Sequence, residues 1–366
     1  MRNLLVLLIG FLILLAAFII LPIREHGETP DAKVPDMEKK KYIVTSKSIK
    51  AHWKKPFEIT LIHNNDSHSV HDNIARTATL VEEIRKANDN TLLLSAGDVT
   101  SWNIGAKRED AIANAFFMNH FGYDGMVLGN HEFDLGEGIV NHEALGNYIK
   151  DSAYPVLAGN VDFSRDEFLE PLADYSYSDE PVEGRINKGY TITVGEEQIG
   201  IFGITHYKDV VTVPGDVSFA DYTETAKEAV AHFESQGINK IIALTHIGIG
   251  NDRRLAEAVP EIDVIIGGHS HVTTSPPNKI GDTLVLQTGE YNTYLGELKL
   301  AFDEKGKISD HQGKLHKVAE AEHHPMTTEL LSIYNQAIQL KINTYADLMQ
   351  YAEEFGIEAT DFELAE

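Results

Sequence analysis

The 366-residue sequence contains no cysteine, which excludes disulfide bonds, thiolate metal sites and cysteine nucleophiles together. Basic residues are scarce, because 31 Lys and Arg stand against 56 Asp and Glu and give a formal net charge of -25. Nucleic-acid binding relies on basic contacts with phosphates, so this charge disfavours a nucleic-acid partner. Any metal ion in this protein must be bound by His, Asp, Glu or Asn.

Charge is missing from one long segment near the amino terminus, where residues 4–21 read LLVLLIGFLILLAAFIIL. As a helix this segment would be roughly 27 Å long, close to the ~30 Å hydrocarbon thickness of a bilayer. We expect residues 1–23 to form a transmembrane anchor or a signal sequence. The apolar run of a signal is usually shorter and no Ala-x-Ala site follows, which favours the anchor. Basic residues flank both ends, so the positive-inside rule does not set the orientation.

Residues 24–56 are charged, contain three prolines and have little sustained period, which is typical of a stalk. The folded part should therefore begin near Phe57. Since 43% of the residues are hydrophobic, the remaining chain can bury a sizeable core.

After Phe57, short apolar runs alternate with amphipathic stretches, which predicts an α/β domain over residues 57–317. The helices are expected at 73–86, 108–121, 137–150 and 223–235, where apolar residues recur three or four apart. Several of the strands should be buried on both faces. The strands are expected at 57–63, 91–96, 125–128, 155–158, 198–205, 240–245, 263–266, 283–287 and 295–302.

Residues 318–366 form an acidic tail with helical spacing at Leu330, Leu331, Tyr334 and Ile338. We expect a helix docked on the domain. Binding of a protein partner through this tail is the alternative.

Metal-ligand residues stand at the carboxyl ends of five predicted strands, where open α/β sheets bind their ligands. Each alone has a simpler explanation, such as a turn, a helix cap or a core histidine. Independent turns have no reason to place carboxylate, imidazole and carboxamide groups at five ends of one sheet, so the set predicts a shared metal site. The five groups are Asn65-Asp66-Ser67-His68, Gly97-Asp98, 129–134 (GNHEFD), Thr245-His246 and 267–271 (GGHSH).

These motifs resemble the signature of the calcineurin-like metallophosphoesterases. The similarity to the 5′-nucleotidase and UDP-sugar hydrolase branch is closer, through 59–68 (ITLIHNNDSH), 129–134, Asn160-Val161, 244–248 (LTHIG) and 287–296 (QTGEYNTYLG). The resemblance spans residues 57–302 and implies a four-layer α/β/β/α sandwich with two metal ions at one sheet edge.

The resemblance also implies which residues hold the ions. One ion would be bound by Asp66, His68 and His271. The other would be bound by Asn130, His246 and His269. The carboxylate of Asp98 would bridge the two ions. Mixed nitrogen and oxygen ligands suit Mn, Zn, Fe or Co.

Two divalent ions about 3.5–4 Å apart lower the pKa of a shared water, and the resulting hydroxide can attack phosphorus in line. The leaving oxygen needs a proton, and His131 is the candidate general acid. Asp134 lies three residues later, so a helical turn would let its carboxylate orient the imidazole. The reaction expected is hydrolysis of phosphate esters.

Three departures affect the substrate. Ser69 follows His68 where the family usually has Gly, and 101–103 (SWN) replaces a Gly-containing loop. The residues after Phe302 are too few for the second, base-stacking domain of secreted 5′-nucleotidases. We expect Asn103 and Asn160 to contact the substrate. Nucleoside monophosphates, other phosphomonoesters, cyclic nucleotides and nucleotide sugars all stay open, with nucleotides favoured.

Two rival functions share the predicted metal set. One is a surface recognition protein that binds metal without turnover, although His131 and Asp134 would then have no purpose. The other is a protein phosphatase, which fits the branch-specific stretches poorly. Relatives in this branch are mostly exported, so the catalytic domain should lie outside the cytoplasm, anchored to the cell membrane or secreted after cleavage.

Overall fold

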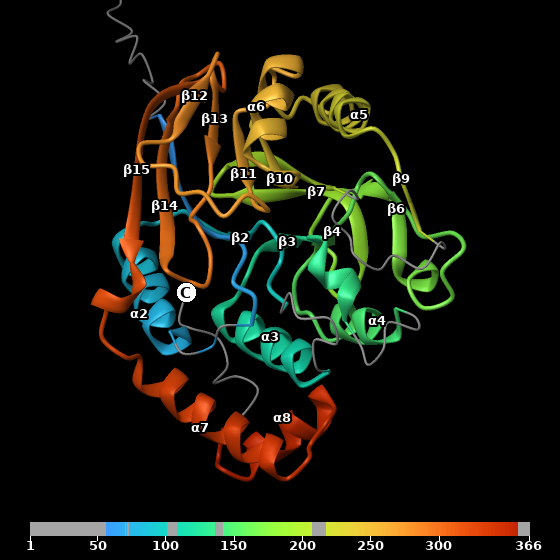
Figure 1. Cartoon of the computed structure of the whole chain (residues 1–366). Helices are drawn as coiled ribbons and strands as arrows, with labels where there is room; N and C mark the ends of the chain where they lie inside the picture. The colour runs from blue at the N-terminus through green and yellow to red at the C-terminus, as the bar shows by residue number, and fades with distance from the viewer. Residues whose placement is uncertain are drawn as a thin grey trace, which may run out of the picture. The chain divides into compact units, whose positions relative to one another are not determined.

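A computed structural model describes residues 56–69, 71, 73–100, 108–135, 142–206 and 217–357 (Figure 1). The predicted anchor at 4–21, most of the stalk and Asn103 lie outside these ranges. Within them, no helix is long and apolar enough to cross a membrane.

The centre of the fold is a 13-stranded sheet with the order β12-β13-β11-β10-β8-β7-β4-β3-β2-β1-β14-β15, and β6 also pairs with β7. β5 (Val161–Asp162) and β9 (Ser218–Phe219) form a separate antiparallel pair. The sheet strands are β1 (Phe57–Asn64), β2 (Thr91–Ser95), β3 (Gly125–Val127), β4 (Val156–Leu157), β6 (Ala173–Ser178), β7 (Ile186–Val194), β8 (Glu197–Thr205), β10 (Ile241–His246), β11 (Val264–Gly267), β12 (Asn278–Ile280), β13 (Thr283–Leu286), β14 (Tyr294–Phe302) and β15 (Ile308–Lys317).

The sheet has two parallel parts, β1-β2-β3-β4-β7 and β8-β10-β11-β13, which meet in the antiparallel pair β7–β8. Contacts past the strand ends tie the parts together, since the Thr205 hydroxyl donates to the Leu128 carbonyl at 2.6 Å. The carboxyl ends of β1, β2, β3, β10 and β11 therefore reach one common edge.

Helices cover both outer faces of the sheet. Figure 1 shows α2, α3 and α4 on one side, with α7 and α8 beside α2 and α3, whereas α5 and α6 lie on the other side. The helices are α2 (Ile74–Ala87), α3 (Arg108–Phe121), α4 (Glu143–Lys150), α5 (Tyr222–Ser235), α6 (Ile249–Ala258), α7 (Pro325–Gln339) and α8 (Tyr345–Glu353). Short 3-10 helices span His131–Asp134, Glu170–Leu172 and Val318–Glu320.

Alternating side chains of the strands supply three separate hydrophobic cores, because successive residues of a strand point to opposite faces. In β1, Leu61 belongs to the core between the two sheet parts, whereas Ile62 packs under the α2 side. In β10, Ile242 joins the central core and Ile241 packs with α5 and α6. The packing order is thus helices, sheet, sheet, helices, with one continuous sheet supplying both inner layers.

The predicted mixed α/β fold is confirmed, and so are the strands that carry the motifs. The elements that the sequence did not predict are β5, β6, β7, β9, β12, β15 and α6. The buried residues of α6 are Asp252, Leu255 and Ala256. Only two of them are apolar, so the sequence shows a weak helical period of apolar residues. β15 lies at the sheet edge and is mostly exposed, so its sequence ISDHQGKLHK lacks the alternation of a half-buried strand.

The predicted tail helix is present as α7, followed by α8. Leu330 and Tyr334 are buried against the α2 and α3 side of the sheet. Polar contacts add to this packing, since the Thr327 hydroxyl lies 2.9 Å from His120 Nε2 on α3, and the Tyr345 hydroxyl accepts from Asn119 at 2.9 Å. The tail helices therefore dock on the domain, and the division at residue 317 stays a prediction.

Candidate metal centre

Six of the seven predicted ligands form two groups at the common sheet edge. Within each group, the candidate ligand atoms lie within 4.8 Å of one another. The remaining residue, Asn130, joins the second group because its Oδ1 lies 2.9 Å from His269 Nδ1. The groups are Asp66, His68 and His271, and Asp98, His246 and His269.

The first group presents nitrogen lone pairs to a single point. His68 Nδ1 lies 3.2 Å from the Thr100 carbonyl, which can only accept, so this atom carries the hydrogen and Nε2 is left as a ligand. His68 Nε2 lies 3.2 Å from His271 Nε2, which in turn lies 3.2 Å from Asp66 Oδ1. His271 Nδ1 lies 2.6 Å from Glu290 Oε2, so this atom carries the hydrogen and both Nε2 atoms carry lone pairs. A cation between them and the carboxylate satisfies all three.

The second group contains a buried nitrogen without a hydrogen-bond partner. His246 donates through Nδ1 to the Ala96 carbonyl at 2.6 Å. Its Nε2 is buried and has no partner of hydrogen-bond geometry, although Asp98 Oδ2 lies 2.9 Å away. These two atoms are close enough to bind one divalent ion together. The residues of both groups therefore fit divalent metal ions.

In the metal-free chain, a proton competes for this position. Burial alone lowers the pKa of His246, but the charge of Asp98 outweighs it and raises the pKa to about 10. Burial raises the pKa of Asp98, but His246 opposes this and holds it below its usual range. Asp98 Oδ1 accepts from the His131 backbone N–H at 2.9 Å, so a role as a bridge between both groups stays a prediction.

The ligand loops have an uncommon backbone conformation. Positive φ is rare for residues other than glycine and persists only where the surrounding structure enforces it. Five ligands have φ between 50° and 73°, namely Asp66, His68, Asp98, His269 and His271.

Two motif glycines are explained by the close approach of these loops. A Cβ on Gly129 would lie 2.2 Å from Asp98 Oδ1, and a Cβ on Gly268 would lie 2.7 Å from the Ala96 carbonyl oxygen. Both distances are too short for any side chain, so the ligand spacing depends on glycine at these two positions.

Glu132 organises the site, although sequence reasoning gave it no role. This buried carboxylate accepts from the backbone N–H groups of Asp98 at 2.9 Å, Val99 at 2.9 Å, Thr100 at 3.1 Å and Gly129 at 2.6 Å. It thereby ties the loop after β2 to the loop after β3. Its place inside the GNHE motif was the available signal.

His131 and Asp134 share a 3-10 helix, and His131 Nδ1 lies 2.7 Å from Asp134 Oδ2. Burial alone lowers the pKa of His131, but the hydrogen bond to Asp134 and the charge of Asp98 outweigh it and raise the pKa. The His131 ring lies edge-on to His68, with centroids 5.5 Å apart. An imidazole whose protonated form is favoured is thus held beside the first group.

Asn160 is buried, and its side chain is bound to the protein. Its Nδ2 donates to the Thr205 carbonyl at 2.8 Å, and its Oδ1 accepts from the Thr205 N–H at 2.9 Å. These bonds fasten the loop after β4 to the end of β8. A substrate contact through Asn160 stays a prediction that this geometry does not favour.

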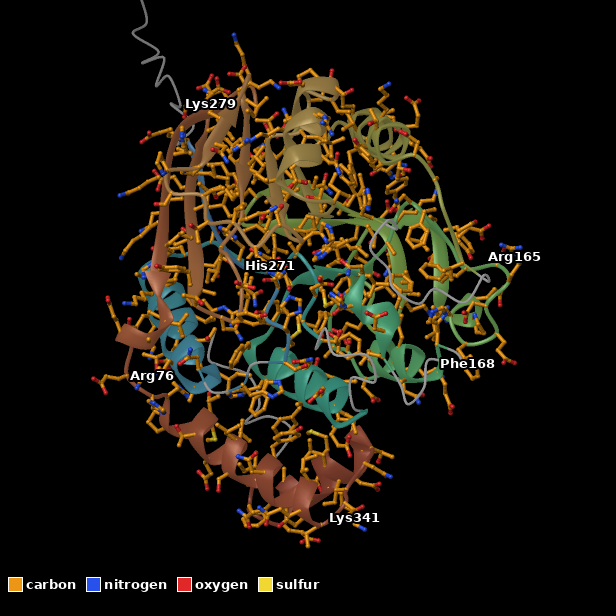
Figure 2. All side chains as sticks on the ribbon, viewed as in Figure 1. Arg76, Arg165, Phe168, His271, Lys279 and Lys341 are labelled. Carbon is orange, nitrogen blue, oxygen red and sulfur yellow. The ribbon has the colours of Figure 1, made fainter. Side chains whose placement is uncertain are left out.

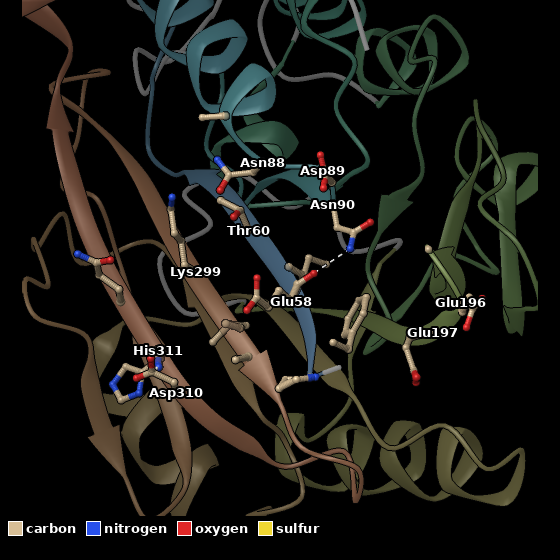
Figure 3. A pocket seen from close by; sticks show the side chains of 18 residues that line it. Glu58, Thr60, Asn88, Asp89, Asn90, Glu196, Glu197, Lys299, Asp310 and His311 are labelled. Carbon is tan, nitrogen blue, oxygen red and sulfur yellow. Dashed lines mark hydrogen bonds between the residues drawn. The ribbon is translucent and has the colours of Figure 1, made fainter. Parts of the chain in front are cut away.

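A cavity of about 670 Å³ lies away from the ligand groups, at the start of β1 (Figure 3). Figure 3 shows acidic side chains around it, including Glu58, Glu196, Glu197 and Asp310. None of the seven predicted ligands lines this cavity. This cavity is therefore separate from the candidate metal centre.

Sheet and ligand groups together define an α/β protein with a metal-binding sheet edge. The family model described as calcineurin-like phosphoesterase matches residues 59–273, well over half of the chain. The chain belongs to this family, as its motifs predicted.

Curated relatives over the same region act on nucleotides. The chain is 34% identical over 286 residues to the trifunctional nucleotide phosphoesterase protein YfkN of Bacillus subtilis, covering 73% of this chain and 20% of that protein. It is 33% identical over 297 residues to the 5′-nucleotidase of Bos taurus, covering 71% and 49%. The chain thus spans half or less of the length of these relatives.

Solved structures show the same fold. The 5′-nucleotidase precursor from Thermus thermophilus matches with a TM-score of 0.66 and 29% identity, covering 78% of this chain and 59% of that one. The calcineurin-like phosphoesterase YfkN from Bacillus subtilis matches with a TM-score of 0.60 and 21% identity, covering 80% and 99%. At that lower identity the likeness concerns the fold alone.

Proposed function

We propose that this protein is a metal-dependent phosphoric ester hydrolase that uses two divalent ions, one at each ligand group. The supporting observation is that each group brings imidazole nitrogens and a carboxylate within 4.8 Å of one another, and that His246 Nε2 is buried without a partner of hydrogen-bond geometry. Such ions would stabilise charge on the phosphoryl oxygens and lower the pKa of an attacking water.

The side chains around the groups have distinct tasks in this reaction. His131 lies beside the first group with a raised pKa, and we assign it the proton donated to the leaving oxygen. Asp134 accepts a hydrogen bond from Nδ1–H of His131, so Nε2 is the nitrogen that would donate the proton to the leaving oxygen. Glu132 holds the Asp98 loop in place, and Asp98 is the proposed bridging ligand.

We propose nucleotides as the substrate class, because the relatives named above are nucleotide phosphoesterases and 5′-nucleotidases. Nucleoside monophosphates come first, and nucleotide sugars and cyclic nucleotides are related possibilities. The ions are proposed to be Mn, Zn, Fe or Co, since the ligands are imidazoles, carboxylates and one carboxamide.

The test is a substrate panel on the purified full chain in detergent, stripped of metal and reloaded with each ion in turn. AMP, UDP-glucose, 2′,3′-cyclic AMP, p-nitrophenyl phosphate and a phosphoserine peptide should be compared at equal concentration. We expect metal-dependent release of phosphate, fastest from nucleotides, and none from the Asp98→Ala variant. Preference for the phosphopeptide would indicate a protein phosphatase, and no turnover with ions bound would indicate a recognition protein.

We also propose that residues 4–21 anchor the chain in the cell membrane with the catalytic domain outside the cytoplasm. The apolar length of this segment supports the proposal. Protease digestion of intact cells should remove the domain. Protection of the domain in intact cells, with cleavage only after lysis, would show that the domain faces the cytoplasm.

A further inference from the structure

The turn between β13 and β14 lies against the first ligand group. Gly289, Tyr291 and Asn292 have φ values of 91°, 58° and 49°. Left-handed backbone at a tyrosine is uncommon, and it persists where surrounding contacts enforce it. This turn is therefore a built feature of the site rather than a loose connection.

Contacts with the loop after β1 clamp the turn. The Tyr291 N–H donates to the Asp66 carbonyl at 2.8 Å. Asn65 makes three hydrogen bonds to the turn. Its Oδ1 accepts from the Thr288 N–H at 2.7 Å and from the Thr288 hydroxyl at 2.9 Å, and its Nδ2 donates to the Gly289 carbonyl at 2.7 Å. The backbone on both sides of Glu290 is thereby fixed relative to the ligand Asp66.

The clamped turn places the Glu290 carboxylate against His271, which Figure 2 labels near the centre of the view. Glu290 Oε2 lies 2.6 Å from His271 Nδ1, and His271 Nε2 lies 3.2 Å from Asp66 Oδ1. A carboxylate accepts from Nδ1–H, so Glu290 leaves Nε2 as the lone-pair atom that faces the group. Glu290 belongs to neither ligand group itself.

The other ligand imidazoles have neutral partners at Nδ1, which for His269 is the Asn130 carboxamide. His68 Nδ1 faces the Thr100 carbonyl, and His246 Nδ1 faces the Ala96 carbonyl. A carboxylate partner makes the imidazole a stronger electron donor than a carbonyl does, and loss of such a partner typically weakens metal binding about 10- to 100-fold. The negative charge of Glu290 thus acts on the first group through His271.

We infer that Glu290 is a positioning residue that raises the affinity of the Asp66–His68–His271 group for its divalent ion, without acting on the Asp98–His246–His269 group. The inference rests on the proposed two-ion function. It adds that the affinities for the two ions are set separately. Occupancy of the more exposed group, which contains His271, depends on Glu290, a residue that itself binds no metal.

The experiment measures ions bound per chain in the full-length protein. Metal-stripped parent and Glu290→Gln should be equilibrated with Mn²⁺ at a series of buffered free concentrations, and bound metal counted by mass spectrometry. The parent should take up two ions. Glu290→Gln should bind one ion with parental affinity and the other about 10- to 100-fold more weakly. Glu290→Ala, which also loses the hydrogen bond, should show at least as large an effect.

Glu261→Gln is the matched control, because Glu261 is exposed and follows α6 at the opposite ends of the strands. It should bind both ions as the parent does. Two ions bound to Glu290→Gln with parental affinities, or two ions weakened equally, would overturn the role of Glu290 while leaving the two-ion site intact. A parent that binds fewer than two ions would overturn the proposed function, and this inference with it.

Discussion

The Asp134 carboxylate lies 2.7 Å from Nδ1 of His131, and the exposed fractions of the two side chains are 1% and 18%. A general acid that donates from the opposite nitrogen needs its other ring nitrogen held in this way. The pair makes a prediction about the pH dependence of hydrolysis.

A general acid works while it is protonated, so activity is present below the pKa of His131 and falls as the pH rises through it. Asp134 raises that pKa. In Asp134→Asn, the alkaline limb of the pH profile of kcat/KM should therefore move to lower pH. Metal content should stay at two ions per chain. An alkaline limb at the parental position would contradict the assignment of His131 as the acid.

Removing the acid itself should separate proton transfer from metal binding. His131→Ala should lower kcat for AMP about 100- to 10,000-fold while both ions stay bound. The loss should be smaller for p-nitrophenyl phosphate, whose leaving group needs no proton. An equal loss for both substrates would show that His131 does not protonate the leaving oxygen.

Asp98→Ala should instead remove metal. Asp98 Oδ2 lies 2.9 Å from His246 Nε2 and the residue is buried, so the variant leaves the second group without its carboxylate. We expect bound metal to fall below two ions and hydrolysis to be lost, as measured by metal analysis beside the rate. Parental metal content would contradict the role of Asp98 as a ligand.

Metal uptake should release protons at neutral pH. The pKa of His246 is about 10 in the metal-free chain, so Nε2 holds a proton that a cation must displace. Apparent affinity should rise with pH until about pH 10 and then level off. Calorimetry in two buffers of different ionisation enthalpy measures the number of protons released per ion bound. A count of zero at neutral pH would show that the ion does not displace a proton from His246.

The tail helices should contribute to stability through their buried face. Leu330 on α7 is 0% exposed, whereas Leu340 just after this helix is 62% exposed. Leu330→Ala should lower the free energy of unfolding by about 2–5 kcal/mol. Leu340→Ala should change it by at most about 0.5 kcal/mol. Denaturant unfolding compares the two, and equal effects would show that α7 does not pack as described.

The sequence predicted that the candidate ligands meet at one sheet edge because they follow apolar strands directly, as Asp66 follows β1 and His246 ends β10. Their convergence followed from the rule that the carboxyl ends of parallel strands share an edge. Glu132 and Glu290 could not be assigned in this way. Each contacts groups on a distant loop, Glu132 with the Asp98 loop and Glu290 with His271, and no local pattern encodes such pairs.

Helices and strands with a weak apolar pattern were not predicted, for a related reason. β7 carries Asn187, Lys188 and Gly189 among its apolar residues, so its run looked interrupted, although most of its positions are buried in the assembled sheet. Burial there comes from neighbouring strands and from the two cores that Ile186, Tyr190 and Val194 enter. A local sequence window contains neither.

The left-handed backbone at five ligands has a consequence for transferring this chemistry. Each such residue costs about 1–3 kcal/mol, which only the surrounding sheet edge and its buried carboxylates offset. A synthetic peptide copying residues 64–69 would relax to ordinary extended conformers and hold cations weakly. Grafting this activity into another scaffold would require the whole rim of loops, because the short motifs do not carry their own shape.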